Sequence, residues 1–280
     1  QNSDFEASNY QFVEFWLLNP FMEKPDGTGH DPDESGFMTF HLGNVSEDIL
    51  RDNLQFYENT LPVGDENLPI VDKAYGKVSL AIPKNDGFDI EGQAQQDLGL
   101  DGLTDDQEQN KFKDYLESWG QIQPQEVFLD PSGDNYCYYN DDDCFDTNDD
   151  LLVRYSKFNN PQVNSPDISG VSTFTRGNPR PDKEDLNNNR SLDQGESFYE
   201  YKIPIANSGG EIDMTNNEFI REVREIELPS DASITEKWYR YRIPIREGTA
   251  FNGIEGFRSI QFMRLLVNGF RTQKTFRMAE

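Results

Sequence analysis

Two stretches of the chain, FYEYKIPI (residues 198–205) and WYRYRIPI (residues 238–245), match position by position. In both, tyrosine and isoleucine alternate with charged or other side chains, so the tyrosines and isoleucines fall on one face of an extended chain. This alternation predicts two β-strands, each with one buried face. Pro204 and Pro244 cannot donate a ladder hydrogen bond, so we expect each to lie at a sheet edge or a strand end.

Other strands outnumber helices along the chain. Aromatic, β-branched or apolar runs predict further strands at residues 12–18, 37–42, 77–82, 223–228 and 259–267. The acidic turn segment EKPDGTGHDPDESG separates the first two of these, which predicts a long hairpin. The best helix candidate is QEQNKFKDYLES (residues 107–118), which places Phe112, Tyr115 and Leu116 on one face.

The composition limits the class of protein. The 280 residues include 52 acidic and 25 basic side chains, for a formal net charge of -27, while 35% hydrophobic and 12% aromatic residues are enough for a packed core. So large a negative charge repels phosphate backbones and anionic headgroups, which argues against nucleic-acid binding and direct lipid binding. Cations are the natural partners of such a chain.

Membrane and export signals are not evident in the sequence. No apolar run reaches the roughly 18 residues of a spanning helix. The first residues, QNSDFEASNYQF, have neither a basic nor an apolar signal region, so we expect any export signal to lie outside this chain.

The stretch EDLNNNRSLDQGE contains the spacing of a calcium-binding EF-hand loop. Counting from Asp185, the oxygen-bearing ligands at positions one, three, five, seven, nine and twelve are Asp185, Asn187, Asn189, Ser191 through its carbonyl, Asp193 and Glu196. Ca²⁺ takes six to eight oxygens, and Glu196 would close the site with two of them. Position six is usually glycine but here is Arg190, and a solvated, asparagine-rich turn is the alternative.

A second loop, DLGLDGLTDDQE, fits the same template. Its ligands would be Asp97, Asp101, Leu103 through its carbonyl, Asp105 and Glu108, with glycine at position six. Position three is Gly99, which has no side chain, so a water would have to complete the site. An acidic N-cap turn is the alternative. Asp130, Asp134 and residues 141–143 could add further sites, but their spacing is not diagnostic and favours a charged loop.

The only two cysteines, Cys137 and Cys144, enclose the acidic segment YYNDDD. Their proximity favours a small disulfide in an oxidising compartment, since zinc would need more Cys or His ligands; two reduced thiols in a loop remain the alternative.

The sequence favours a protein without catalytic activity. It has no GxSxG, HExxH or phosphate-binding glycine loop, and His30 and His41 fit structural roles.

An ordered series of segments runs along the chain: FVEFWLLNPF, LGNVSEDIL, DLGLDGLTDDQE, DPSGDNYCYY, LLVRYSKFNN, EDLNNNRSLDQGESFYEYKI, KWYRYRIPI and IQFMRLLVNGF. In this order the segments resemble part of the SprA/Sov family, the giant outer-membrane translocons of type IX secretion and gliding motility. The resemblance implies a soluble, non-enzymatic region of a much longer translocon, exposed to the cell exterior or the periplasm. Its implied partners are other translocon subunits and secreted protein cargo.

The N-terminal strand pattern also resembles jelly-roll modules of the galactose-binding type, which place their terminal strands side by side and often hold structural calcium. We therefore predict a mainly β chain forming a single elaborated domain. Its jelly-roll-like β-sandwich would come from about residues 1–84 and 198–280, and a loop-rich, calcium-ordered insertion with one or two short helices from about residues 85–197. This fold suggests an alternative function, a calcium-dependent carbohydrate- or surface-binding module.

Overall fold

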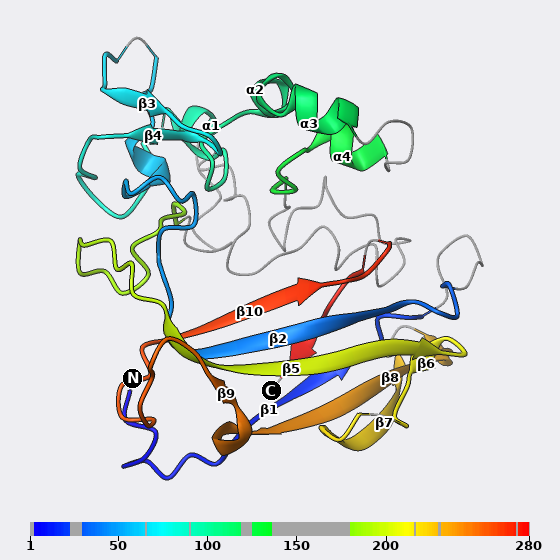
Figure 1. Cartoon of the computed structure of the whole chain (residues 1–280). Coiled ribbons are helices and arrows are strands. Elements are labelled where there is room, and N and C mark those ends of the chain that lie inside the picture. Colours follow the sequence, from blue (N-terminus) through cyan, green and yellow to red (C-terminus); the bar gives the residue numbers. More distant parts are fainter. Residues whose placement is uncertain are drawn as a thin grey trace. The chain divides into compact units, whose positions relative to one another are not determined.

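The computed structural model describes residues 3–22, 30–64, 66–89, 91–118, 125–135, 180–215, 217–228, 231–272 and 274–279. The chain divides into two compact units (Figure 1). We call Gln1–Val45 with Gly195–Glu280 the β unit, and Ser46–Gln194 the loop unit. The chain is mainly β, with antiparallel sheets and a few short helices.

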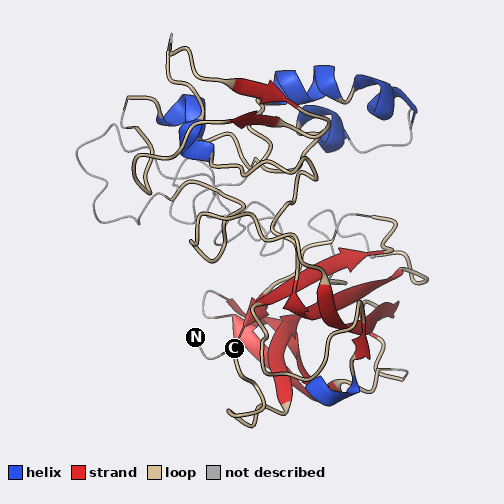
Figure 2. Ribbon diagram, turned by 60° about the vertical axis from the view of Figure 1, so that its left-hand side comes forward, coloured by secondary structure: helices blue, strands red, loops and turns tan. Residues whose placement is uncertain are grey.

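The β unit contains two antiparallel sheets. One has the strand order β11-β1-β8-β7 and the other β10-β2-β5-β6, with β9 also paired to β5. The bounds are β1 Phe12–Leu18, β2 Ser35–Asn44, β5 Ser197–Ser208, β6 Glu211–Ile212, β7 Ile220–Leu228, β8 Asp231–Pro244, β9 Thr249–Ala250, β10 Phe262–Asn268 and β11 Met278–Ala279, and a 3-10 helix, η4 Ile245–Glu247, follows β8. Figure 2 shows these strands gathered in one body.

The two matching stretches form β5 and β8, and each buries the predicted face. In β8 and η4, Tyr239, Tyr241, Ile243 and Ile245 are at most 1% exposed. In β5, Tyr201, Ile203 and Ile205 are at most 5% exposed, while Tyr199 is half-buried. Burying one such side chain stabilises the fold by about 1.5–3 kcal/mol, so these faces anchor the unit.

One hydrophobic core joins the two sheets. Phe15 and Leu17 of β1 belong to the same buried cluster as Phe40 and Leu42 of β2, together with the buried faces of β5 and β8. The sheets therefore pack face to face as a β-sandwich built from the two ends of the chain. The more specific jelly-roll, galactose-binding-like class stays a prediction.

The predicted hairpin between residues 12–18 and 37–42 is wrong. β1 pairs with β8 and β11, whereas β2 pairs with β5 and β10, so the two strands belong to different sheets. Their apolar faces meet across the core instead, where the rings of Phe15 and Phe40 lie 5.3 Å apart. Two strands with strongly apolar faces bury more surface on opposite sides of a core than as neighbours in one sheet.

The N-terminal and C-terminal strands lie side by side, since Trp16 and Leu17 of β1 pair with Ala279 and Met278 of β11. The prolines also take the expected positions. Pro244 is the last residue of β8. Pro204 lies on the edge of β5 between the two short segments paired there, β9 at Tyr199–Glu200 and β6 at Asn207–Ser208.

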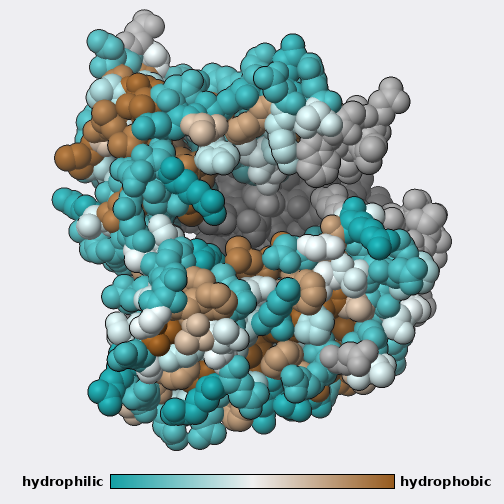
Figure 3. All heavy atoms as spheres, viewed as in Figure 1, coloured by the Kyte–Doolittle hydropathy of each residue, from teal (hydrophilic) through white to brown (hydrophobic). Residues whose placement is uncertain are grey.

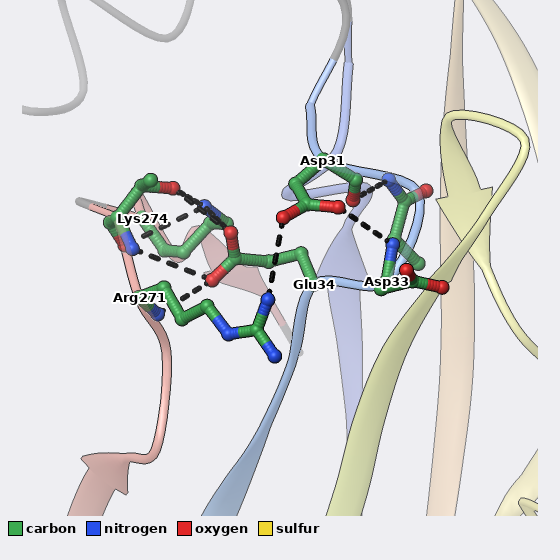
Figure 4. Close-up of polar contacts among 7 residues, drawn as sticks. Asp31, Asp33, Glu34, Arg271 and Lys274 are labelled. Atoms are coloured by element: carbon green, nitrogen blue, oxygen red, sulfur yellow. Dashed lines mark hydrogen bonds and ion pairs between the residues drawn. The ribbon is translucent and has the colours of Figure 1, made fainter.

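A buried carboxylate fixes the segment between β10 and β11 to the start of β2 (Figure 4). Glu34 accepts hydrogen bonds from the backbone N–H of Arg271 (2.7 Å) and from the hydroxyl of Thr272 (3.1 Å), and lies 3.5 Å from Lys274 Nζ. Its carbonyl accepts the N–H of Asn207 in β5. Several chain segments thus meet at one glutamate.

The loop unit holds the described α-helices and a small sheet. Its elements are η1 Glu58–Thr60, β3 Ile70–Asp72, β4 Lys77–Ser79, α1 Gln93–Gln96, α2 Asp105–Lys111, α3 Lys113–Ser118 and α4 Gln125–Leu129. The unit begins at Ser46, earlier than the position near residue 85 expected for the insertion. The predicted helix at residues 107–118 divides into α2 and α3 at Phe112, the C-cap of α2.

The main apolar cluster of the loop unit is small, with Leu50, Phe56, Leu61 and Val78 as its buried members. Phe88, Leu103 and Leu116 are buried outside it. Buried acids add order through backbone hydrogen bonds. Glu184, fully buried, accepts the N–H groups of Ile49, Leu50 and Phe56 at 2.7–3.0 Å.

Hydrophilic residues predominate on the face that Figure 3 shows, with smaller apolar patches between them. In the described part of the chain, no helix has the length and apolar character needed to cross a bilayer.

Candidate metal centre

The loop at residues 97–108 turns sharply at Gly102 and then enters α2. Gly102 has φ +64°, a left-handed conformation that suits glycine, and the next N–H, that of Leu103, donates to Asp101 Oδ1 at 2.8 Å. Thr104 is the N-cap of α2, and the side chain of Gln107 reaches back to its N–H, as in a capping box. This start of α2 places Glu108 in the first turn, fully buried.

Carboxylates from the loop meet carboxylates from residues 130–134. One oxygen each of Asp101, Glu108 and Asp134 lie within 4.8 Å of one another, and so do oxygens of Asp105, Glu108 and Asp130. Asp101 and Glu108 are buried, and the other three are half-buried. We call these five residues the carboxylate cluster. Within the described ranges, these are the two groups of three acidic, histidine or cysteine side chains close enough to share an ion.

Hydrogen bonds satisfy part of the carboxylate cluster. Ser132 donates its N–H to Glu108 Oε2 at 2.9 Å and its hydroxyl to Asp101 Oδ2 at 2.6 Å. Asp130 accepts the N–H groups of residues 133–135, which fixes the turn. Glu108 Oε1 is buried with no donor among the described residues, so one oxygen at the centre of the cluster lacks a partner.

The electrostatics of the carboxylate cluster are unfavourable without a cation. Burial, followed by the charges of Asp101 and Glu108, raises the pKa of Asp134 to about 8. Burial also raises the pKa of Glu108 to about 7, more than the N–H of Ser132 lowers it, and the pKa of Asp101 rises for the same reason. Desolvated like charges favour protonation or a bound cation, so the cluster is chemically suited to hold a metal ion.

Asp97, predicted at position one, lies apart from the two groups of three. Its carboxylate accepts a hydrogen bond from the Gln93 amide at 3.2 Å. Its charge adds to burial in raising the pKa of Glu58 to about 9 and that of Asp182 to about 6. Asp97 nevertheless lines a cavity of about 360 Å³ with Leu103, Thr104, Asp105, Asp106, Asp134 and Asn135.

The loop that begins at Asp185 brings five predicted residues together. Asp185 accepts the N–H groups of Asn189 and Arg190 at 3.0 and 2.9 Å, and the amides of Asn187 and Asn189 both donate to Asp193 Oδ2. Ser191 donates its N–H to Asn189 Oδ1 at 2.7 Å. Arg190 has φ +61°, so it adopts the left-handed conformation expected at position six despite its side chain.

Glu196, predicted to close the Asp185 loop, belongs to the β unit and binds Arg264 through both oxygens, at 2.7 and 3.0 Å. Arg264 also contacts the ring of the buried His41, which stacks on Phe198 at 4.0 Å. Within the loop unit, the buried Glu47 supports the Asp185 loop by accepting the N–H groups of residues 186, 187 and 193.

Asp130 and Asp134 were not assigned to a site from the sequence. The one available signal was Gly99, which leaves position three of the loop at residues 97–108 without a side-chain ligand. The predicted cysteine pair, Cys137 and Cys144, lies outside the described residues.

Comparison with known proteins identifies the family. The model of the SprA_N family, described as "Motility related/secretion protein", matches residues 112–280, more than half of the chain. The chain belongs to this family. The SprA_N match covers the Asp185 loop and strands β5 to β11, and it confirms the resemblance to SprA/Sov proteins. No curated protein matches the chain.

Proposed function

We propose that this chain is a non-enzymatic region of an outer-membrane protein-secretion translocon, of the type that serves type IX secretion and gliding motility. Membership of the SprA_N motility and secretion family is the observation that carries the proposal. The region would be exposed to the periplasm or the cell exterior and would contact other translocon subunits and secreted cargo.

The way the buried acids are used supports a structural role for the loop unit. Glu184 and Glu58 each accept two or more backbone N–H groups from distant segments, which orders loops around a small apolar core. We propose that Ca²⁺ at the carboxylate cluster adds to this order and takes no part in chemistry. A cation that binds only the folded state stabilises it by about 2.7 kcal/mol at 100 times its dissociation constant.

The test of the secretion role uses the full-length parent in its own outer membrane. The region is replaced by a flexible linker, and secretion of type IX cargo, gliding, and co-purification of other translocon subunits are measured at matched parent abundance. We expect all three to be impaired. Normal secretion, gliding and subunit recovery would overturn the proposal.

The two-sheet sandwich with its terminal strands side by side favours a second candidate, a calcium-dependent carbohydrate- or surface-binding module. This candidate predicts saturable binding on a glycan array in Ca²⁺ that is lost in EGTA. The secretion proposal predicts a blank array together with subunit co-purification.

A further inference from the structure

We propose that Asp134 supplies the ligand missing at position three of the loop at residues 97–108, so that one Ca²⁺ joins this loop and α2 to the segment at residues 130–134. This inference rests on the calcium role proposed above and assigns a ligand that lies outside the twelve-residue template.

The Asp134 carboxylate lies in the space where a side chain at position 99 would be. Gly99 has φ +81° and no side chain, and a Cβ built on its backbone would lie 2.2 Å from Asp134 Oδ2 and 2.7 Å from Asp134 Cγ. The Asp134 carboxylate therefore fills the volume that a position-three side chain occupies in an ordinary loop of this kind. A ligand from 35 positions further along the sequence replaces the local one.

Asp134 lies beside two buried carboxylates. Its carboxylate comes together with those of Asp101 and Glu108, and Glu108 is 0% exposed with Oε1 lacking a donor among the residues described. A fully buried glutamate oxygen beside two other carboxylates is costly unless it binds a cation. This unsatisfied oxygen is independent of the clustering of acidic residues and points to a bound ion.

The chemistry favours Ca²⁺. The three carboxylates carry three negative charges and offer up to six oxygens, and the Leu103 carbonyl or waters from the adjoining cavity can complete a shell of six to eight. Mg²⁺ demands octahedral geometry and keeps several waters, which suits a crowded carboxylate site less well. Asp130 holds the backbone N–H of Asp134 at 3.1 Å, which keeps the ligand turned toward the loop.

The consequence is a cross-link without covalent bonds. Asp101, Glu108 and Asp134 lie on two segments that approach each other around Ser132, whose N–H and hydroxyl bind Glu108 and Asp101. Ca²⁺ would hold these segments together, because the complete set of ligands exists only when both are in place, so that binding stabilises the folded form.

The experiment is calcium titration calorimetry on three single variants of the whole chain, each of which removes one negative charge. Asp134→Asn and Glu108→Gln remove proposed ligands, while Asp106→Asn removes an exposed charge from the same turn of α2 and is the control. We expect Glu108→Gln to abolish Ca²⁺ binding at the proposed site. At the same site, Asp134→Asn should weaken the Ca²⁺ affinity at least tenfold, and Asp106→Asn should weaken it less than twofold.

Thermal melting separates a ligand role from a structural one. In EGTA, Asp134→Asn should melt at or above the wild-type temperature, because the amide carries neither the like-charge repulsion of an ionised carboxylate nor the cost of protonating one, and it should lose the rise in melting temperature that Ca²⁺ gives the wild type. If the wild type binds no Ca²⁺, the calcium proposal fails. If it binds Ca²⁺ and Asp134→Asn behaves like Asp106→Asn, the calcium proposal stands and the assignment of Asp134 is overturned.

Discussion

Glu34 and Lys274 form a buried ion pair, with 3.5 Å between Oε2 and Nζ and side chains that are 0% and 2% exposed (Figure 4). Burial alone would raise the pKa of Glu34. The N–H of Arg271, the charge of Lys274 and the hydrogen bonds of Thr272 outweigh burial and hold the pKa below its usual value. The folded β unit therefore favours the ionised glutamate, and with it the connection between β2 and the C-terminal segment.

This depressed pKa predicts how stability depends on pH. The contribution of Glu34 is fully present above its unfolded pKa of about 4.3 and is lost as pH falls through the lower folded value. Glu34→Gln removes the negative charge that faces the buried Lys274 ammonium and should cost about 3 kcal/mol at pH 7.

Urea unfolding between pH 3 and pH 7, followed by tryptophan fluorescence, measures this effect. Exposed Glu255→Gln is the matched control and should change the free energy of unfolding by less than about 0.5 kcal/mol. If the difference in the free energy of unfolding between Glu34→Gln and the wild type does not shrink at low pH, the ion pair is not the source of that difference.

The pairing of Glu196 with Arg264 makes a second prediction. The twelve-residue spacing predicts that Glu196 is a calcium ligand. In the folded chain, however, both of its oxygens bind the guanidinium of Arg264, which lies over the ring of Phe198. We expect Glu196→Gln to leave the number of bound Ca²⁺ ions unchanged and to cost about 1 kcal/mol of stability through the weakened Arg264 contact. Calcium titration calorimetry measures the number of bound ions, and thermal melting measures the stability. Loss of one calcium equivalent in Glu196→Gln would show that Glu196 is a calcium ligand after all.

A third prediction compares two glycines with the same backbone conformation. Gly102 and Gly64 have φ +64° and +62°, but a Cβ at Gly102 would lie 2.8 Å from the Lys77 carbonyl oxygen, whereas one at Gly64 would meet nothing within 4 Å. Gly64→Ala should cost about 1 kcal/mol, from left-handed strain alone. Gly102→Ala should cost about 3 kcal/mol, because overpacking adds to the strain. Equal losses in chemical denaturation would mean that the loop yields to the methyl group.

The cysteine pair gives a fourth prediction. If Cys137 and Cys144 are joined, reduction takes up two electrons and two protons, so the protein should gain the mass of two hydrogen atoms, as read by mass spectrometry of material from an oxidising compartment. Because the loop is short, reduction should cost on the order of 2–3 kcal/mol at most. Two free thiols that react with an alkylating reagent before reduction would exclude the bond.

Local patterns in the sequence determined much of the β unit. The alternation in residues 198–205 and 238–245 correctly predicted the buried faces of β5 and β8, and residues 12–18 coincide with β1. Each of these features depends on side chains two positions apart, so a short stretch of sequence contains all the information. The family could also be recognised from the order of short motifs, and the SprA_N match confirms it.

Only the tertiary structure decided which segments became neighbours. Nothing local distinguishes a β1–β2 hairpin from two strands that face each other across a core. In the folded chain Phe15 and Phe40 belong to one buried cluster, with their rings 5.3 Å apart. The same holds for the metal-ligand candidates. Asp101 and Glu108, seven positions apart in the predicted loop, lie close together. The arrival of Asp134 beside Gly99 and the pairing of Glu196 with Arg264 depend on residues 35 and 68 positions apart. Contacts over such separations depend on how the whole chain packs, because the entropy lost in closing a long loop is recovered only from the interactions of the completed fold.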